Sequence, residues 1–224
     1  MNSNQIESFI NQLNETFSYQ NCIIKKLSQN VEIAKVWDLE EDDNIKPHTF
    51  FLIKNNKEYV SAILVMYEDL HWFVLPQHRG KGYLLKALKK VILPYIFDVL
   101  EYEEQKITIN KSQIGIDNYK SSINVALKSG FKKIDDINFI IKDSDIKTSY
   151  VPENILYKGL NDIEVNKIVN ELTSMSKRLY QLNTKIEYAY GCNMLDYTNN
   201  TLKILSNKVD CNISVIKDII EDYR

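Results

Sequence analysis

The order of apolar and polar residues predicts strands and helices that alternate through the first two thirds of the chain. Two apolar runs, 49–54 and 59–67, flank the turn-forming residues Asn55-Asn56-Lys57, a pattern typical of a β-hairpin. A third apolar run, 70–75, ends at Pro76. We expect further strands at 106–110 and within 132–142.

The N-terminal segment 3–18 has the apolar spacing of an amphipathic helix, with Ser3 in position to cap it. Its apolar residues recur at steps of three and four: Ile6, Phe9, Ile10, Leu13 and Phe17. The following segment, 22–39, fits either strands or a short helix.

Two more helices are expected between the strands. The first covers 80–100 and is kinked or ended at Pro94, which has no N–H to donate. The second begins at Asp117 or Asn118 and stops at Gly130, because glycine commonly follows a helix C-terminus.

The last third of the chain has a purely helical pattern. Two series of residues recur at steps of three and four, which indicates a heptad seam in each. The first is Val165, Ile168, Leu172, Met175, Leu179, Leu182, Ile186 and Ala189, and the second is Leu195, Thr198, Leu202, Leu205, Val209, Asn212, Ile216 and Ile219. Because Tyr190-Gly191-Cys192-Asn193 interrupts them, we expect a helical hairpin over 161–223. One unbroken helix is the alternative.

These elements predict an α+β (mixed α/β) domain at 1–150 and a helical hairpin at 151–224. The 224 residues are 44% hydrophobic and 26% charged, enough to bury a sizeable core. A net charge of −2 disfavours nucleic-acid binding as the main role, and no apolar run is long enough to span a membrane. Three scattered cysteines and an N-terminus unlike a signal peptide lead us to expect a cytoplasmic protein without a metal site.

One loop concentrates residues that the chain otherwise uses sparingly. Six glycines and three arginines occur in all, yet Arg79-Gly80-Lys81-Gly82 contains two of the glycines and one arginine. The loop follows the strand at 70–75 and precedes a helix. Glycine lets backbone N–H groups approach a ligand, and a helix N-terminus favours an anion. The pattern predicts a phosphate or pyrophosphate site; a plain tight turn is the alternative.

The nine residues from Val74 to Gly82 (Val-Leu-Pro-Gln-His-Arg-Gly-Lys-Gly) resemble motif A of the GCN5-related N-acetyltransferase family, V-x-P-x-x-R-G-x-G. The residues from Ser122 to Phe131 are similar to its motif B, and the order of elements over about residues 20–145 also fits. This resemblance implies an acyl-coenzyme A N-acyltransferase fold with a mostly antiparallel central sheet. It also implies acetyl-coenzyme A as the cofactor.

The resemblance further implies which residues hold the cofactor. In the family, the loop amides hold the pyrophosphate, and the strand end, here Leu75, offers backbone groups to the pantetheine arm. Asn110 and Ser122 correspond to the other side of that arm. The implied cofactor-binding residues are Val74, Leu75, Gln77, His78, Arg79, Gly80, Lys81, Gly82, Asn110 and Ser122.

Transfer to an amine requires that the amine lose a proton, to a base or along a water path. Glu68, Asp69 and His71 precede the loop, where family members often carry a base, and His71 ionises nearest to neutral pH. Strand alternation leaves open whether His71 faces the site. Catalysis by orientation of the thioester alone is the alternative.

A tyrosine of motif B often protonates the departing thiolate in the family. Ala126 stands at that position here, which leaves Tyr119 and Tyr67 as candidate acids. The sequence therefore favours an N-acetyltransferase acting on a primary amine of a small molecule or peptide. The alternative is a non-catalytic scaffold of the same fold that acts through its C-terminal helices.

The heptad seam carries an expectation of its own. If the hairpin leaves one side of the seam exposed, that side is a large apolar patch. Such a patch is normally covered by another part of the chain or by a partner. We expect a homodimer through the C-terminal helices; packing of the hairpin on its own domain is the alternative.

Overall fold

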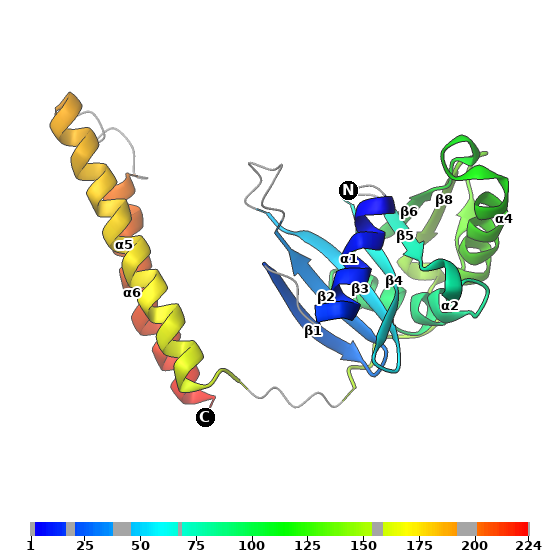
Figure 1. Cartoon of the computed structure of the whole chain (residues 1–224), viewed down its shortest axis with the longest axis horizontal. Coiled ribbons are helices and arrows are strands. Elements are labelled where there is room, and N and C mark those ends of the chain that lie inside the picture. Colours follow the sequence, from blue (N-terminus) through cyan, green and yellow to red (C-terminus); the bar gives the residue numbers. More distant parts are fainter. Residues whose placement is uncertain are drawn as a thin grey trace. The chain divides into compact units, whose positions relative to one another are not determined.

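The computed structural model describes residues 3–16, 21–37, 46–66, 69–153, 159–191 and 201–223. The chain divides into two compact units, Met1–Ile155 and Leu156–Arg224 (Figure 1). The first unit is a mixed α/β fold built on antiparallel sheet, and the second is helical. Both features confirm the predicted fold class.

Five antiparallel strands, paired in chain order, form the main sheet of the first unit. They are β1 (Cys22–Ser28), β2 (Val31–Val36), β3 (His48–Asn55), β4 (Glu58–Val65) and β5 (Leu70–Val74). The pair β3–β4 is the predicted hairpin. The segment that fitted strand or helix forms β1 and β2. In β2, Ile33 lies in one hydrophobic cluster and Ala34 lies in the other. Because both faces of the strand carry apolar residues, the sequence lacks the alternation of apolar and polar residues that identifies a half-exposed strand.

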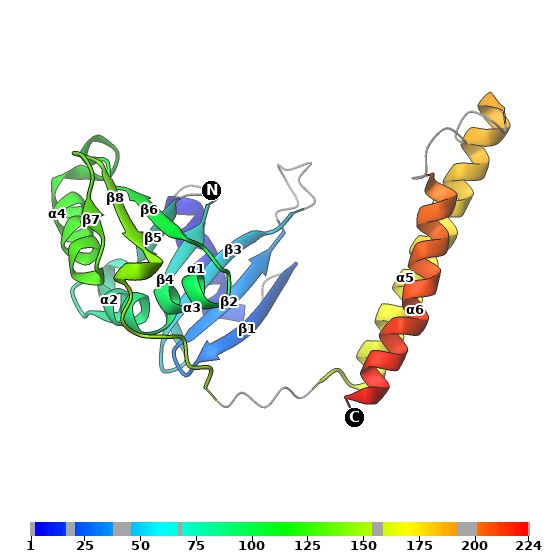
Figure 2. The same ribbon diagram turned by 180° about the vertical axis from the view of Figure 1, so that it is seen from behind.

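Helices cover both faces of this sheet (Figures 1 and 2). On one face, α1 (Ser3–Thr16) buries four residues of its predicted apolar stripe: Ile6, Phe9, Ile10 and Leu13. The other face carries α2 (Tyr83–Ala87), a π-helical turn (Leu88–Ile92) and α3 (Leu93–Asp98), which follow one another directly. The π-helical turn ends two residues before Pro94, whose missing N–H removes a regular helical bond.

A smaller sheet continues the unit in the order β6 (Glu104–Thr108), β8 (Asn138–Lys142) and β7 (Lys132–Lys133). It touches the main sheet through one parallel bridge, between Asp69 and Lys106. Beyond this bridge, β5 and β6 belong to separate sheets, so the outer edge of β5 is not paired with another described strand.

The helix α4 (Lys111–Ser129) joins the two strands β6 and β7. Its first residues begin earlier than the sequence predicts, because the side chain of Asn110 caps them by accepting from the N–H of Ser112 at 3.0 Å. Gly115, with φ 75° and ψ 166°, then breaks the helix close to the expected start. Gly130, with φ 108°, ends it as predicted.

The second unit is the predicted hairpin of α5 (Asp162–Tyr190) and α6 (Leu202–Asp222). At its centre, the hydroxyl of Ser176 donates to the carbonyl of Ser206 at 3.0 Å, and the hydroxyl of Ser206 donates to the carbonyl of Ser176 at 2.9 Å. Nearer the loop, Oδ1 of Asn183 accepts from the N–H of Lys203 at 3.3 Å. These pairings show that the two helices run in opposite directions.

One of the two expected rows of the seam is at least partly buried at every described position from Val165 to Ile216, whereas most of the other row is exposed. Residues at least partly buried in the hairpin include Val165, Leu172, Leu179, Ile186, Leu202, Val209 and Ile216, all of them predicted. The other buried row is Val169, Ser176, Asn183, Ser206, Ile213 and Ile220, each four positions after a member of the first. The sequence instead placed Ile168, Met175, Leu182, Ala189, Leu205, Asn212 and Ile219 there; of these, Ile168 and Leu182 are half-buried and the other five are exposed. Met175 is 59% exposed and Ile219 is 51% exposed. Leu195 and Thr198 lie outside the described residues.

A tether between α1 and β4 yields a stability prediction. Asn14 donates from Nδ2 to the carbonyl of Tyr59 at 2.9 Å, and its Oδ1 accepts from the N–H of Tyr59 at 2.7 Å. Replacing Asn14 by alanine removes both partners, so we expect Asn14→Ala to lower the free energy of unfolding by about 1–3 kcal/mol. Urea denaturation measures this loss. The control Asn11→Ala, at an exposed position of the same helix, should change it little. Equal losses in the two variants would contradict the role of the tether.

Candidate functional site

The loop between β5 and α2 makes two tight turns in succession. The first is the short 3₁₀ turn Pro76–His78, in which the N–H of His78 donates to the carbonyl of Leu75 at 2.9 Å. The second contains Gly80 and Gly82, with φ of 73° and 81°. Other residues rarely adopt these left-handed values, which accounts for the glycines. The loop therefore enters the helix through a conformation that the sequence encodes locally.

A run of backbone N–H groups opens this helix. Among the described residues, no backbone carbonyl accepts from the N–H groups of residues 80–85, and the helical ladder begins with the N–H of Lys86 bonded to the carbonyl of Gly82 at 3.0 Å. A Cβ atom built on Gly80 or Gly82 would meet nothing within 4 Å. The N–H groups thus lie beside open space at a helix N-terminus, an arrangement that attracts phosphate.

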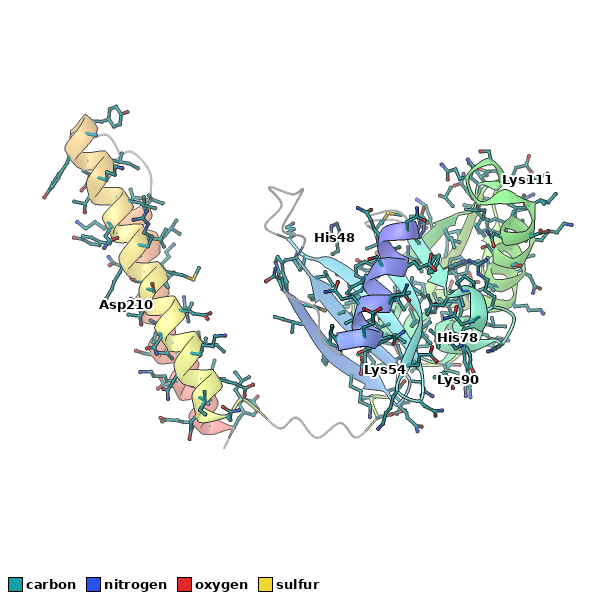
Figure 3. All side chains as sticks on the ribbon, in the orientation of Figure 1. His48, Lys54, His78, Lys90, Lys111 and Asp210 are labelled. Atoms are coloured by element: carbon teal, nitrogen blue, oxygen red, sulfur yellow. The ribbon has the colours of Figure 1, made fainter. Side chains whose placement is uncertain are left out.

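His78 does not line this open side of the loop, although the resemblance implied that it would. Its side chain is 8% exposed, and Nε2 lies 3.0 Å from Oε1 of Glu58 at the start of β4 (Figure 3). The N–H of His78 is already bonded to Leu75. His78 therefore anchors the loop to the β3–β4 hairpin, and we treat it as a positioning residue.

Arg79 connects the loop to β5 and to α4. Its Nε donates to the carbonyl of Val74 at 3.2 Å, and its Nη1 donates to Oδ1 of Asn118 at 3.3 Å. The guanidinium also lies 6.0 Å from the centre of the Phe73 ring. Gln77 and Lys81 are exposed and stand beside it on the loop surface. The chain thus places a fixed positive charge next to the N–H groups of the loop.

The unpaired edge of β5 forms a second part of the site. The N–H of Leu75 donates to the carbonyl of Val60 at 3.0 Å, and its carbonyl accepts from His78. Both backbone groups of Leu75 are therefore used within the protein. Because alternate residues of a strand point their N–H and C=O groups to opposite edges, those of Val74 and Trp72 point away from β4, and the carbonyl of Val74 accepts from Arg79. That edge can bind an extended amide-containing ligand as an additional strand would bind.

Three residues of α4 that the sequence analysis considered have different surroundings. Ser122 accepts a 3.4 Å hydrogen bond from Nε1 of Trp72 and so lies beside β5. The hydroxyl of Tyr119 donates to the carbonyl of Asp136 at 3.3 Å, on the turn before β8, which leaves it poorly placed to serve as an acid. Ala126 is fully buried in the core. Asn110 uses its side chain to cap α4.

The candidate bases lie at the start of β5. Oδ1 of Asp69 accepts from the N–H groups of Leu70 and Thr108, both at 2.9 Å, and burial raises the pKa of this carboxyl against the opposing effect of these bonds. Burial also lowers the pKa of His71, and the nearby Asp69 charge opposes that shift. His71 therefore favours the neutral form, which can accept a proton. Glu68 and Tyr67 lie outside the described residues.

The alternation of β5 settles which face His71 occupies. Trp72 belongs to the hydrophobic cluster under α2 and α3, and Phe73 belongs to the cluster under α1. His71, one residue before Trp72, therefore faces the side of α1. The structure brings together the loop, the edge of β5 and the first half of α4, and it leaves His71 on the opposite face from Ser122.

Sequence reasoning missed three residues that shape the site. Trp72 and Asn118 contact Ser122 and Arg79, and Glu58 holds His78. The spacing of Asn118 and Ser122, four apart on one helix, would have indicated a shared face toward the loop. Trp72 could have been found from its alternation with Val74.

Comparison with known proteins gives limited guidance. No protein-family model matches the sequence, and no curated protein matches it. Among solved structures, the chain is similar to the crystal structure of an acetyltransferase (GNAT family) from Bacillus anthracis, with 15% sequence identity and a TM-score of 0.36. That match covers 43% of this chain and 66% of the other.

In the part of the chain that the structure describes, no helix is long and apolar enough to cross a membrane. The same residues contain no cluster of three metal-binding side chains.

The lowered pKa of His71 predicts a stability change with pH. Above about pH 6.5 the imidazole is neutral in the folded and unfolded chains alike. Below this pH the unfolded chain binds a proton that the folded chain resists, so the free energy of unfolding should fall as the solution is acidified. We expect wild-type protein to lose more stability than His71→Gln between pH 7.5 and 5.5, as measured by urea denaturation at both values. An equal loss in both proteins would contradict the assignment.

Proposed function

We propose that the first unit is an N-acetyltransferase that takes an acetyl group from acetyl-coenzyme A and transfers it to a primary amine of a small molecule or peptide. The observation that carries the proposal is the loop 79–82. There a motif A-like sequence adopts two left-handed glycine conformations and presents unbonded N–H groups at a helix N-terminus. We place the protein in the cytoplasm, where the unpaired thiols of Cys22 and Cys211 would remain reduced.

Different residues around the loop would bind different parts of coenzyme A. The N–H groups of residues 80–85 would hold the pyrophosphate, and the side chain of Arg79 would add positive charge. The outward N–H and C=O of Trp72 and the N–H of Val74 would orient the pantetheine arm along β5, since the Val74 carbonyl is bonded to Arg79. Coenzyme A, when bound, supplies the acetyl thioester. The protein contributes a fixed position for that thioester relative to the amine.

One proton must leave the amine, and one must reach the departing sulfur. His71, neutral and partly buried on the α1 face, would accept the amine proton through intervening water, because it lies on the opposite face of β5 from Ser122. The amine nitrogen then bonds to the acetyl carbon as the carbon–sulfur bond breaks. Because Ala126 has no proton to donate and the Tyr119 hydroxyl is engaged elsewhere, the thiolate would take its proton from water or from the protonated base.

Ala126, in place of a tyrosine that acts as an acid, also supports a second candidate function, that of a non-catalytic scaffold. A scaffold that binds coenzyme A without turnover would need no acid and no base. Release of free thiol in the presence of acetyl-coenzyme A and a panel of primary amines distinguishes the two functions. Sustained release that depends on an added amine supports the enzyme. Binding without release supports the scaffold.

Two glycine variants test the cofactor site. Gly82→Trp should weaken coenzyme A binding at least about tenfold, because the indole would project into the open space beside the loop N–H groups. Gly159→Trp is the matched control, since Gly159 also has a positive φ, of 64°, and also has nothing within 4 Å of its Cβ position. Isothermal titration calorimetry with coenzyme A gives the two affinities. Wild-type affinity in Gly82→Trp would reject the pyrophosphate site.

A further inference from the structure

The hairpin leaves an apolar stripe only partly covered along one side. On α5 the stripe consists of Ile168 and Leu182, which are half-buried, and Met175, which is 59% exposed. Each of them lies three residues after a residue that faces α6. On α6 it contains Leu205 and Ile219, again three residues after inward-facing positions, and these are 38% and 51% exposed. Three residues turn a helix by about 300°, or 60° backwards. The stripe residues of each helix are therefore rotated by about 60° from the positions that face the other helix. Because the two helices are antiparallel, these rotations place the α5 row and the α6 row on the same side of the hairpin.

Exposed charges border the stripe on α5 in a particular order. Four charged residues follow one another at seven-residue intervals along the outer edge of the stripe: Glu164, Glu171, Arg178 and Lys185. The two in the first half are acidic, and the two in the second half are basic. A second α5 in the opposite direction would therefore place opposite charges next to each other along the whole edge.

The positions of these charges fix the register of such a pair. Glu171 with Arg178, and Glu164 with Lys185, are both centred between positions 174 and 175. Ile168 and Leu182 are centred on Met175. The apolar stripe and its charged edge thus share one centre of symmetry. That centre lies close to the middle of α5, so two copies would overlap along almost the full helix, about 40 Å.

We propose that the stripe binds a second copy of this chain, with α5 antiparallel to α5 of the partner about a two-fold axis at Met175. The two hairpins then form a four-helix bundle, in which Glu171 of each chain pairs with Arg178 of the other. A neutral or uniformly charged edge would fit many partners, whereas this edge is complementary to itself. The inference concerns the second unit and does not depend on the acetyltransferase proposal.

A single-residue variant tests which face forms the dimer. In the full-length chain, we expect wild-type protein to sediment as a dimer at tens of micromolar and Met175→Glu to sediment as a monomer. The substitution places two carboxylates together at the two-fold axis. The matched control is Asn170→Glu, at an exposed position on the opposite side of α5, which should remain dimeric. Helical content by circular dichroism should be equal in all three proteins. A monomeric wild type, or a dimeric Met175→Glu, overturns the proposal.

A charge exchange tests the antiparallel register. Glu171→Arg and Arg178→Glu should each raise the dimer dissociation constant about tenfold, because each replaces two attractive pairs by two repulsive ones. The double variant Glu171→Arg/Arg178→Glu restores complementarity between the chains and should return the constant to near the wild-type value. If the double variant is no tighter than the single variants, the proposed pairing is wrong. Sedimentation equilibrium in low salt is the measurement, since added salt weakens exposed pairs.

Discussion

The first unit depends on how the start of β5, in the main sheet, is joined to β6 of the smaller sheet. Asp69 receives the N–H of Leu70 at the start of β5 and the N–H of Thr108 at the end of β6, so one carboxylate oxygen joins the two strands. The strands then part, since the only strand pairing between the two sheets among the described residues is the bridge from Asp69 to Lys106. An unpaired strand edge is normally covered or charged. Here the edge leads to the glycine loop, so the outward N–H groups of Trp72 and Val74 and the N–H groups of the loop lie at the two ends of one turn, whose own N–H groups at Leu75, His78 and Arg79 are bonded within the protein. The carboxylate that the sequence offered as a base is thus better understood as the residue that positions this edge.

Local signals in the sequence determined what could be predicted of this site. The left-handed glycines, the turn at Pro76 and the end of α4 at Gly130 are each encoded within a few residues, and the sequence identified all three. The orientation of His78 could not be read in this way, because it depends on Glu58, twenty positions earlier on β4. The strand identity of β2 was hidden for a related reason. Apolar residues lie on both of its faces, Val31 and Ile33 in one cluster and Ala34 and Val36 in the other, so the sequence does not show one apolar and one polar face.

The seam of the hairpin shows a different limit. Ranking positions by side-chain size selects Met175 and rejects Ser176, yet the helices meet at Ser176 and Ser206. A small side chain lets two backbones approach, and reciprocal hydroxyl-to-carbonyl bonds then satisfy the groups that the contact buries. The larger residues are displaced to the flank. The heptad pattern therefore predicted both helices and one of the two inward-facing rows of each helix correctly. It placed the other row one position too early, at Met175 in place of Ser176, for example.

The polar residues at the centre of the hairpin determine which apolar residues lie at its surface. If the larger residues had filled the contact between α5 and α6, both helices would have buried their apolar rows within one chain, and the remaining surface would be polar. Because Ser176, Asn183 and Ser206 occupy that contact instead, the apolar row of Ile168, Met175 and Leu182 lies at its flank, with Met175 exposed and the other two half-buried. Polar groups in a helical interface also fix register, since their hydrogen bonds form in one alignment only. The same three residues thus hold the two helices in a unique alignment and leave the stripe, with its ordered charges, available along the length of α5.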